Sequence, residues 1–147
     1  MFHKKFQSRT LSALGLMLIV VLSFASCDST TPTEPITDIT WQWASLSESE
    51  PAALSVTPDP ENYTLTLLPD GTLSIKADCN MVSGSYTLDG SSISIVLGPS
   101  TMAFCGEQSL DLQYLELFNN VESYALENGQ LVFGLKEGAG EMVFKSE

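Results

Sequence analysis

Residues 63–79, YTLTLLPDGTLSIKADC, predict a β-hairpin and set the pattern for the rest of the chain. Apolar and polar side chains alternate on both sides of Pro69-Asp70-Gly71, so the apolar ones share one face of each strand. A turn signal between two alternating runs is typical of a hairpin. The alternation extends to Cys79, which stands between an aspartate and an asparagine.

Further hairpins follow from the same period of two. Residues 85–97 alternate around Asp89-Gly90, and residues 124–135 place Asn128-Gly129 between two apolar runs. Asn-Gly is the strongest two-residue hairpin signal. Residues 141–145, EMVFK, supply a last short strand.

Two other segments complete the predicted domain. Residues 40–46, TWQWASL, predict an early strand with Trp41, Trp43 and Ser45 on one face. From Ser109 to Tyr124 the spacing changes to three or four, which predicts an amphipathic helix of three to four turns. Its apolar stripe is Leu110, Tyr114, Leu117, Phe118 and Val121. We expect this stripe to cover the apolar face of the sheet; a partner-binding or lipid-binding helix is the alternative.

The first 26 residues have the features of a bacterial lipoprotein signal peptide. A basic start (His3, Lys4, Lys5, Arg9) precedes an apolar stretch from Leu11 to Phe24. That stretch is shorter than the roughly 20 residues of a membrane span and fits a signal-peptide core. Residues 24–27, FASC, resemble a lipobox with Phe24 in place of the usual leucine, which predicts lipid on Cys27. An ordinary cleaved signal and an uncleaved anchor are the alternatives.

The predicted mature chain, residues 27–147, is strongly acidic. It contains all 18 acidic residues and three of the six basic ones, a net charge of −15. Nucleic-acid binding is excluded because phosphate recognition needs a basic face. Adhesion to anionic lipid by charge is disfavoured too, so membrane attachment would come from acyl chains on Cys27. Residues 27–38 are rich in Thr and Pro and predict a tether ahead of the folded domain, residues 39–147.

No catalytic or metal-binding constellation is present in the mature chain. His3 is the sole histidine and lies in the signal peptide, which excludes a Ser-His or Cys-His pair and an imidazole metal site. Phosphate-loop, dinucleotide and EF-hand motifs are absent as well. Asp78, Glu107 and Asp111 flank the cysteines, and we interpret them as solvated charges rather than a catalytic acid pair. We therefore expect no enzyme activity, cofactor or metal.

Cys79 and Cys105 are the two cysteines left once Cys27 is acylated. Outside the inner membrane, paired thiols tend to be oxidised, which predicts a disulfide between them. A bond closing a loop of this size, about 26 residues, corresponds to roughly 3.5 kcal/mol in the chain-entropy model. A reactive thiol is the rival interpretation, but C-x-x-C is absent and the acidic neighbours disfavour a thiolate.

The residues after Cys79 are interpreted as structural, with a ligand site as the alternative. Gly84 predicts a bulge or a close backbone approach. Asn80 can bond nearby backbone and fix the turn after Cys79. Tyr86 alternates with Leu88 and should place its ring on the buried face with its hydroxyl near the rim.

Three segments in order resemble the META/HslJ-like domain family: ADCNMVSGSYTLDGSSISI (77–95), GPSTMAFC (98–105) and SLDLQYLELFNNVESYALENGQLVF (109–133). The family's motif positions fall on Cys79-Asn80, Gly84, Tyr86, Thr101, Met102, Cys105 and the strand Met142-Val143-Phe144, with Trp41 as the early tryptophan. The resemblance covers roughly Ile39 to Lys145. It implies a strongly curved antiparallel sheet with one packed helix, and it supplies no catalytic residues.

Pattern and resemblance together predict an α+β, β-rich fold of about seven to eight strands with one helix at about Ser109–Tyr124. The resemblance also implies a bacterial cell-envelope lipoprotein, facing the periplasm or the outside of the cell and supporting envelope integrity or stress tolerance. The expected molecule is a monomer that binds an envelope protein or a lipid. The alternative is a periplasmic inhibitor or receptor for a basic enzyme, which an acidic domain would suit. An apolar cavity under the helix would favour the first, and a rigid exposed loop with an acidic cluster the second.

We predict that the mature protein starts at Cys27 and carries lipid there, because FASC follows a basic start and a short apolar core. The intact mass of membrane-extracted protein checks this. The Cys27→Ala variant should leave the membrane fraction; a variant that stays there contradicts the prediction.

Overall fold

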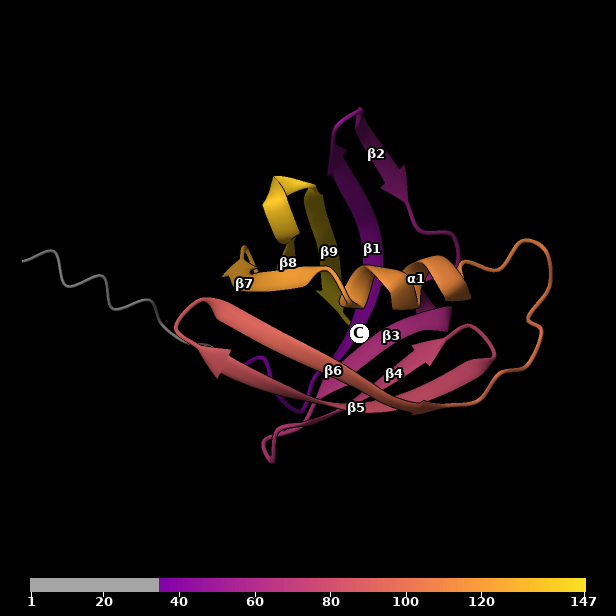
Figure 1. Cartoon of the computed structure of the whole chain (residues 1–147), viewed down its shortest axis with the longest axis horizontal. Coiled ribbons are helices and arrows are strands. Elements are labelled where there is room, and N and C mark those ends of the chain that lie inside the picture. Colours follow the sequence, from indigo (N-terminus) through magenta and orange to yellow (C-terminus); the bar gives the residue numbers. More distant parts are fainter. Residues whose placement is uncertain (1–34) are drawn as a thin grey trace, which may run out of the picture. The chain divides into compact units, whose positions relative to one another are not determined.

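The computed structural model describes residues 35–147, which form one antiparallel sheet and a short helix (Figure 1). The predicted signal peptide, Cys27 and the predicted tether as far as residue 34 lie outside the described residues. Among residues 35–147, no helix is long and apolar enough to cross a membrane. The elements are β1 (Thr40–Ser49), β2 (Ala52–Val56), η1 (Pro60–Asn62), β3 (Tyr63–Leu67), β4 (Thr72–Ala77), β5 (Asn80–Asp89), β6 (Ser92–Ser100), α1 (Asp111–Phe118), β7 (Val121–Glu127), β8 (Gln130–Leu135), η2 (Lys136–Gly138) and β9 (Gly140–Ser146).

The sheet closes on itself through β1. Its strand order is β2-β1-β3-β4-β5-β6-β7-β8-β9, with a further pairing of β1 and β9. One edge of β1 pairs with β9 along most of its length, and the other edge is shared between β3 and β2. The junction of β6 and β7 is narrow, with Ser92 opposite Ser123 as its single aligned pair. The predicted strongly curved antiparallel sheet is confirmed.

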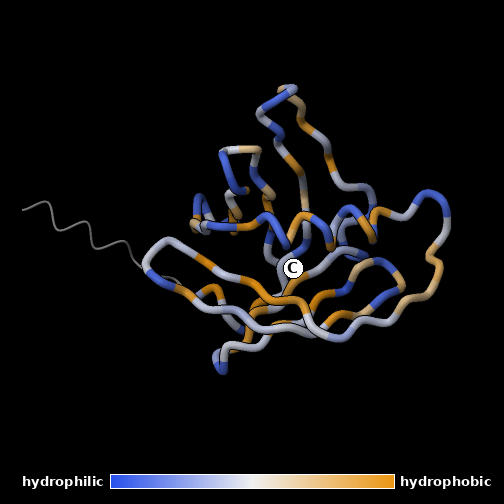
Figure 2. Tube along the Cα trace, viewed as in Figure 1, coloured by the Kyte–Doolittle hydropathy of each residue, from blue (hydrophilic) through white to orange (hydrophobic). Residues whose placement is uncertain are grey.

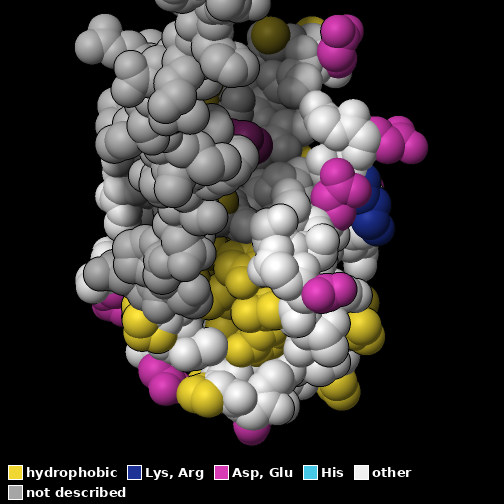
Figure 3. Space-filling view, turned by 90° about the vertical axis from the view of Figure 1, so that its left-hand side faces the viewer, with side chains coloured by type: hydrophobic (Ala, Val, Ile, Leu, Met, Phe, Trp, Pro, Cys, Tyr) yellow, Lys and Arg dark blue, Asp and Glu magenta, His cyan; other side chains and the backbone are white. Residues whose placement is uncertain are grey.

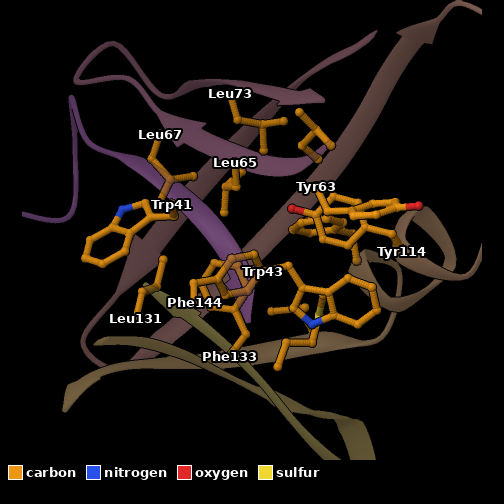
Figure 4. Close-up of a cluster of buried hydrophobic side chains, with 14 of the residues drawn as sticks. Trp41, Trp43, Tyr63, Leu65, Leu67, Leu73, Tyr114, Leu131, Phe133 and Phe144 are labelled. Carbon is orange, nitrogen blue, oxygen red and sulfur yellow. The ribbon is translucent and has the colours of Figure 1, made fainter. Parts of the chain in front are cut away.

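Aromatic side chains fill the interior, and α1 contributes two of them (Figure 4). Tyr114 and Phe118 are fully buried. The Tyr114 ring stacks on Trp43 of β1 with the ring centroids 5.0 Å apart and meets Phe118 edge to face at 5.1 Å. Phe118 in turn contacts Phe133 of β8 and Phe144 of β9, with centroids 6.3 and 6.4 Å away. The helix therefore packs on the inner face of the sheet, as expected.

The helix is shorter than the sequence pattern predicts. α1 has eight residues and ends at Phe118, and β7 begins at Val121. Val121 continues the helical spacing in the sequence, yet it pairs with Leu135 of β8. The Asn128-Gly129 hairpin joins β7 to β8, and strand pairing through this hairpin takes precedence over helical periodicity.

A bulge in β1 changes which side chains face inward. The β1–β9 register shifts between Trp43 and Ser45, so an extra residue in β1 reverses the alternation there. Leu46 is buried in place of Ser45, which is half-buried. The prediction that Ser45 shares the face of Trp41 and Trp43 is therefore wrong.

Strand β2 is the ninth strand and was not predicted. Its sequence, AALSV, has no strict alternation and all five residues are exposed. It forms a hairpin with the second half of β1.

The folded domain begins before the predicted boundary at Ile39. Ile36 is buried, and its carbonyl accepts a 2.9 Å hydrogen bond from the Trp41 indole N–H. The Asp38 N–H donates to the Leu67 carbonyl at 2.9 Å. Composition alone places residues 36–38 in the tether, but these contacts make them part of the domain.

Gly84 lies at a close approach of the β5 and β6 backbones. The register of these strands shifts between Val82 and Gly84, and a Cβ on Gly84 would lie 2.5 Å from the Val96 carbonyl oxygen. We expect Gly84→Ala to lower the free energy of unfolding by about 1–3 kcal/mol, because the clash is with backbone. Chemical denaturation measures this loss.

Gly90→Asn is the matched control in the neighbouring turn. Gly90 has φ 59° and no atom within 4 Å of a Cβ, and asparagine tolerates this conformation. Its free energy of unfolding should stay within about 0.5 kcal/mol of the parent. An equal loss in both variants would contradict the steric explanation.

Candidate functional site

The β4–β5 turn places Cys79 at the surface. Strand β4 ends at Ala77, which pairs with Asn80, and Asp78 has φ 57°. This two-residue turn reverses the chain, so Cys79 is exposed and does not continue the inward alternation. The predicted disulfide is confirmed: Cys79 bonds to Cys105, with the two Cα atoms 5.5 Å apart. It ties the loop after β6 to this turn.

The Asn80 side chain holds the same loop from within. It is 4 % exposed. Its Oδ1 accepts hydrogen bonds from the Ala103 N–H at 2.8 Å and the Thr101 hydroxyl at 3.0 Å. Its Nδ2 donates to the Ala103 carbonyl at 3.0 Å and to Asp111 at 3.1 Å. Asn80 thus fixes a loop more than twenty residues away, and not only the adjacent turn.

Thr101 continues the pairing of the loop with β5. Its N–H donates to the Met81 carbonyl at 3.0 Å, and its hydroxyl accepts from the Met81 N–H at 2.9 Å. The loop from Thr101 to Leu110 therefore starts from a fixed backbone. Beyond this point it runs at the surface to the start of α1 (Figure 1).

The loop exposes a run of apolar side chains. Met102 is 93 % and Phe104 85 % exposed, and Leu112 on α1 is exposed too. Figure 2 shows this hydrophobic part of the loop, followed by a hydrophilic part that contains Glu107. We call Met102, Phe104 and Leu112 the loop surface. Exposed apolar side chains gathered in one place are typical of an interaction site.

A groove runs between the loop and the start of α1. Its volume is about 610 Å³, and both apolar and acidic side chains line it. It lies beside the helix and not beneath it, because Tyr114 and Phe118 fill the space beneath. Glu107 is exposed at one end and Asp111 is half-buried where it accepts from Asn80. The lining residues include Asn80, Thr101, Met102, Phe104, Glu107, Asp111, Leu112 and Leu115.

Gly84 and Tyr86, which the motif groups with Asn80, lie elsewhere in the fold. Tyr86 is buried and its hydroxyl donates to the Leu68 carbonyl at 2.7 Å. Burial, with the nearby Asp70 carboxylate, raises the pKa of Tyr86, so this hydroxyl stays protonated as a donor. Both residues stabilise the sheet, and neither lines the groove.

Phe104 and Leu112 belong to the loop surface but were not singled out from the sequence. A signal for both was present. Phe104 lies in an apolar run without strand period, and Leu112 falls outside the apolar stripe of the helix. A hydrophobic residue outside the buried pattern of its own element is a candidate for exposure.

The polar groups at the groove are hydroxyls, amides and carboxylates. Residues 35–147 include no histidine, and no three of their acidic or cysteine side chains are grouped to hold a metal ion. The residues that line the groove can make apolar contacts and can hydrogen-bond through carboxylate and backbone oxygens. Sixteen carboxylates against three lysines give the described residues a net charge of −13. Figure 3 shows that acidic side chains are also scattered over the opposite end of the domain.

A closed antiparallel sheet, an inserted helix and a disulfide-fixed loop define a small β-rich domain. The chain belongs to the META domain family, whose model matches residues 34–147. Its fold is similar to that of a protein from Burkholderia xenovorans solved by NMR, with a TM-score of 0.62 and 20% sequence identity over 76% of this chain and 83% of the other. It is also similar to a DUF4847 family protein from Bacteroides vulgatus, with a TM-score of 0.58 and 13% identity over 75% of this chain and 93% of the other. At these identities the likeness concerns the fold alone. The search of curated proteins gives no significant match.

We expect Asn80→Ala to destabilise the domain by about 2 kcal/mol, because it leaves the backbone groups of Ala103 without their partner. Urea denaturation of the oxidised protein measures the loss. The Met81→Ala control removes a half-exposed neighbour and should cost less than about 1 kcal/mol. Equal losses would show that Asn80 does not hold the loop.

Proposed function

We propose that this protein is a non-enzymatic, lipid-anchored binding module of the bacterial cell envelope, and that the loop surface binds a partner protein. The observation that carries the proposal is the near-complete exposure of Met102 and Phe104 on a loop fixed at its base. Exposed apolar side chains are costly in water and are usually retained for contact with a partner. Because the disulfide and Asn80 hold the loop, little conformational freedom is lost when it binds.

A protein fits this surface better than a lipid does. A lipid chain needs an apolar cavity that shields it from water, whereas the interior here is filled by aromatic rings and the groove is open and flanked by Glu107 and Asp111. The net charge of −13 would also repel anionic lipid headgroups. The same charge attracts a partner with a basic face and speeds their encounter.

The anchor in this proposal is lipid on Cys27. The eight residues from 28 to 35 would let the domain stand at most about 25 Å from the bilayer when extended. A short tether would keep the loop surface close to membrane-bound partners and raise their effective concentration. The expected role in envelope integrity or stress tolerance rests on the resemblance to the family.

An inhibitor or receptor for a basic enzyme is the second candidate. The observation in its favour is the combination of a disulfide-fixed loop, exposed apolar side chains on it and the carboxylates of Glu107 and Asp111 in the adjoining groove. Such a loop can enter a cleft as a preorganised wedge. The two candidates share one surface and differ in whether the partner loses activity on binding.

The test is site-specific photocrosslinking in the producing cell. A photoreactive residue at position 104 should capture one dominant envelope protein with a basic surface. The same residue at position 96 is the control, because Val96 is an exposed apolar residue on β6. The captured partner is then purified, and its activity is measured with and without the domain to show whether binding inhibits it.

We expect the Met102→Ser/Phe104→Ser variant to keep its melting temperature within a few degrees, because both side chains are exposed. Its affinity for the captured partner should fall by at least about tenfold, since two apolar contacts are lost. Val96→Ser should leave both quantities unchanged. Undiminished binding by the double variant, or equal capture from positions 96 and 104, would contradict the proposed surface.

A further inference from the structure

Strand β2 has a free edge. It pairs with β1 alone, and no other strand of residues 35–147 lies against its second edge. In Figure 1 the β1–β2 hairpin stands out from the rest of the domain. Leu54 is 71 % and Val56 75 % exposed.

The backbone groups of Leu54 and Val56 point toward this edge. The Thr57 N–H donates to the Ala44 carbonyl of β1 at 3.0 Å. Successive residues of a strand direct their amide groups to opposite edges, so Ser55 and Ala53 face β1 with Thr57. Leu54 and Val56 therefore present both an N–H and a carbonyl on the free edge.

Nothing in β2 protects this edge. Edge strands usually carry lysine, proline or a bulge that prevents pairing with another chain. The sequence AALSV has no charge and no proline, and its register with β1 is continuous from Ala52 to Val56. Such an edge is suited to strand addition, in which a peptide gains backbone hydrogen bonds from the sheet.

A pocket beside β2 can receive a side chain of the added strand. Its volume is about 320 Å³. Ser55 pairs with Leu46, whose side chain is buried, so Ser55 faces the inner side of the hairpin where this pocket lies. Every second side chain of an added strand would point the same way. The pocket is lined by Trp43, Leu46, Ser55, Val56, Thr57, Pro58, Gln108, Leu110 and Gln113.

The acidic residues around β2 favour a partner strand with basic ends over a second copy of the domain. Glu48 and Glu50 are exposed at the tip of the hairpin, and Asp59 and Glu61 are exposed just beyond the other end of β2. A second copy of the domain would place carboxylates against carboxylates, whether the two β2 strands ran parallel or antiparallel. A strand with basic residues at its ends would instead place opposite charges together.

We propose that the free edge of β2 binds an extended segment of a partner polypeptide by strand addition, and that this segment has apolar residues at alternate positions and lysine or arginine at its ends. The site is separate from the loop surface. Gln108, Leu110 and Gln113 line the β2 pocket, whereas Asp111 and Leu112 line the groove on the loop side. Strand addition therefore does not depend on the function proposed for the loop.

The test uses the full chain in mild detergent with a synthetic peptide, KKVTVTVKK, as the probe. Amide hydrogen exchange is followed by NMR with and without the peptide. Leu54 and Val56 should gain at least about tenfold protection, because their N–H groups acquire partners. Ala53 and Ser55 already face β1 and should change little. The glutamate-flanked peptide EEVTVTVEE should not protect Leu54 and Val56, because the carboxylates near both ends of β2 would repel it.

Leu54→Pro is the decisive variant. It removes an edge N–H while the ladder with β1 keeps its hydrogen bonds, and proline is tolerated where the N–H of an edge strand points to solvent. Peptide affinity should fall by at least about tenfold. Leu54→Thr keeps the N–H and should bind within about threefold of the parent. Should Leu54→Pro fail to fold, N-methylation of the peptide's central valine removes an N–H from the other side and should weaken binding similarly.

Each of several results would overturn the proposal. They are no protection at about 1 mM peptide, undiminished binding by a folded Leu54→Pro variant, protection confined to the loop surface, and equal binding of the glutamate-flanked peptide. A dimer of the full chain that Leu54→Pro converts to a monomer would show that a second copy occupies the edge, which also contradicts it. The Met102→Ser/Phe104→Ser variant should bind the peptide at β2 as the parent does, even if it no longer binds the partner of the loop surface. Failure of the loop proposal is therefore distinguishable from failure of this one.

Discussion

The pairing of β1 with three other strands is the constraint on which the rest of the structure depends. One edge of β1 pairs with β9 from Trp41 to Glu48, and the other edge is divided between β3 and β2. Because β3 occupies the first part of that edge, β2 pairs with the remainder and has no second neighbour among the strands of residues 35–147. The same arrangement closes the sheet around an interior that must be filled. The helix fills it with Tyr114 and Phe118, which are packed among rings from β1, β8 and β9.

The start of α1 is held by polar contacts from two strands. The Leu110 N–H donates to the Tyr63 hydroxyl at 2.9 Å, and Asp111 accepts from Asn80 at 3.1 Å. The first bond gives a partner to a backbone N–H at the helix start, where such groups otherwise lack one, and both bonds hold this end of the helix. They also fix the place where the two proposed binding surfaces meet, since the loop groove and the β2 pocket lie on either side of this helix start. The two proposed surfaces are of different kinds, one based on side chains and one on backbone.

Sequence reasoning succeeded where the structure depends on neighbouring residues. The turns at Asp70-Gly71, Asp89-Gly90 and Asn128-Gly129 each join two paired strands as predicted. It failed where pairing with a distant strand takes precedence over the local pattern. The bulge after Trp43 follows from pairing with β9, and Val121 leaves the helical pattern because it pairs with β8. Cys79 continues the alternation in the sequence, but the tight turn at Asp78 turns it outward.

Residue type and short spacing were enough to predict the strand alternation, the turn positions and the acidic charge. The partner of Cys79 could be predicted for another reason: residues 28–147 contain just two cysteines, so the choice needed no knowledge of the fold. Tertiary structure decided what Asn80 holds, since its partners lie 21 to 31 residues along the chain. It also decided that Met102 and Phe104 are exposed while Tyr114 and Phe118 are buried, although all four are large apolar residues. The free edge of β2 likewise exists because β3 occupies part of the edge of β1. Exposure and edge position are properties of the assembled sheet, and they follow from contacts between segments that no short window of sequence contains.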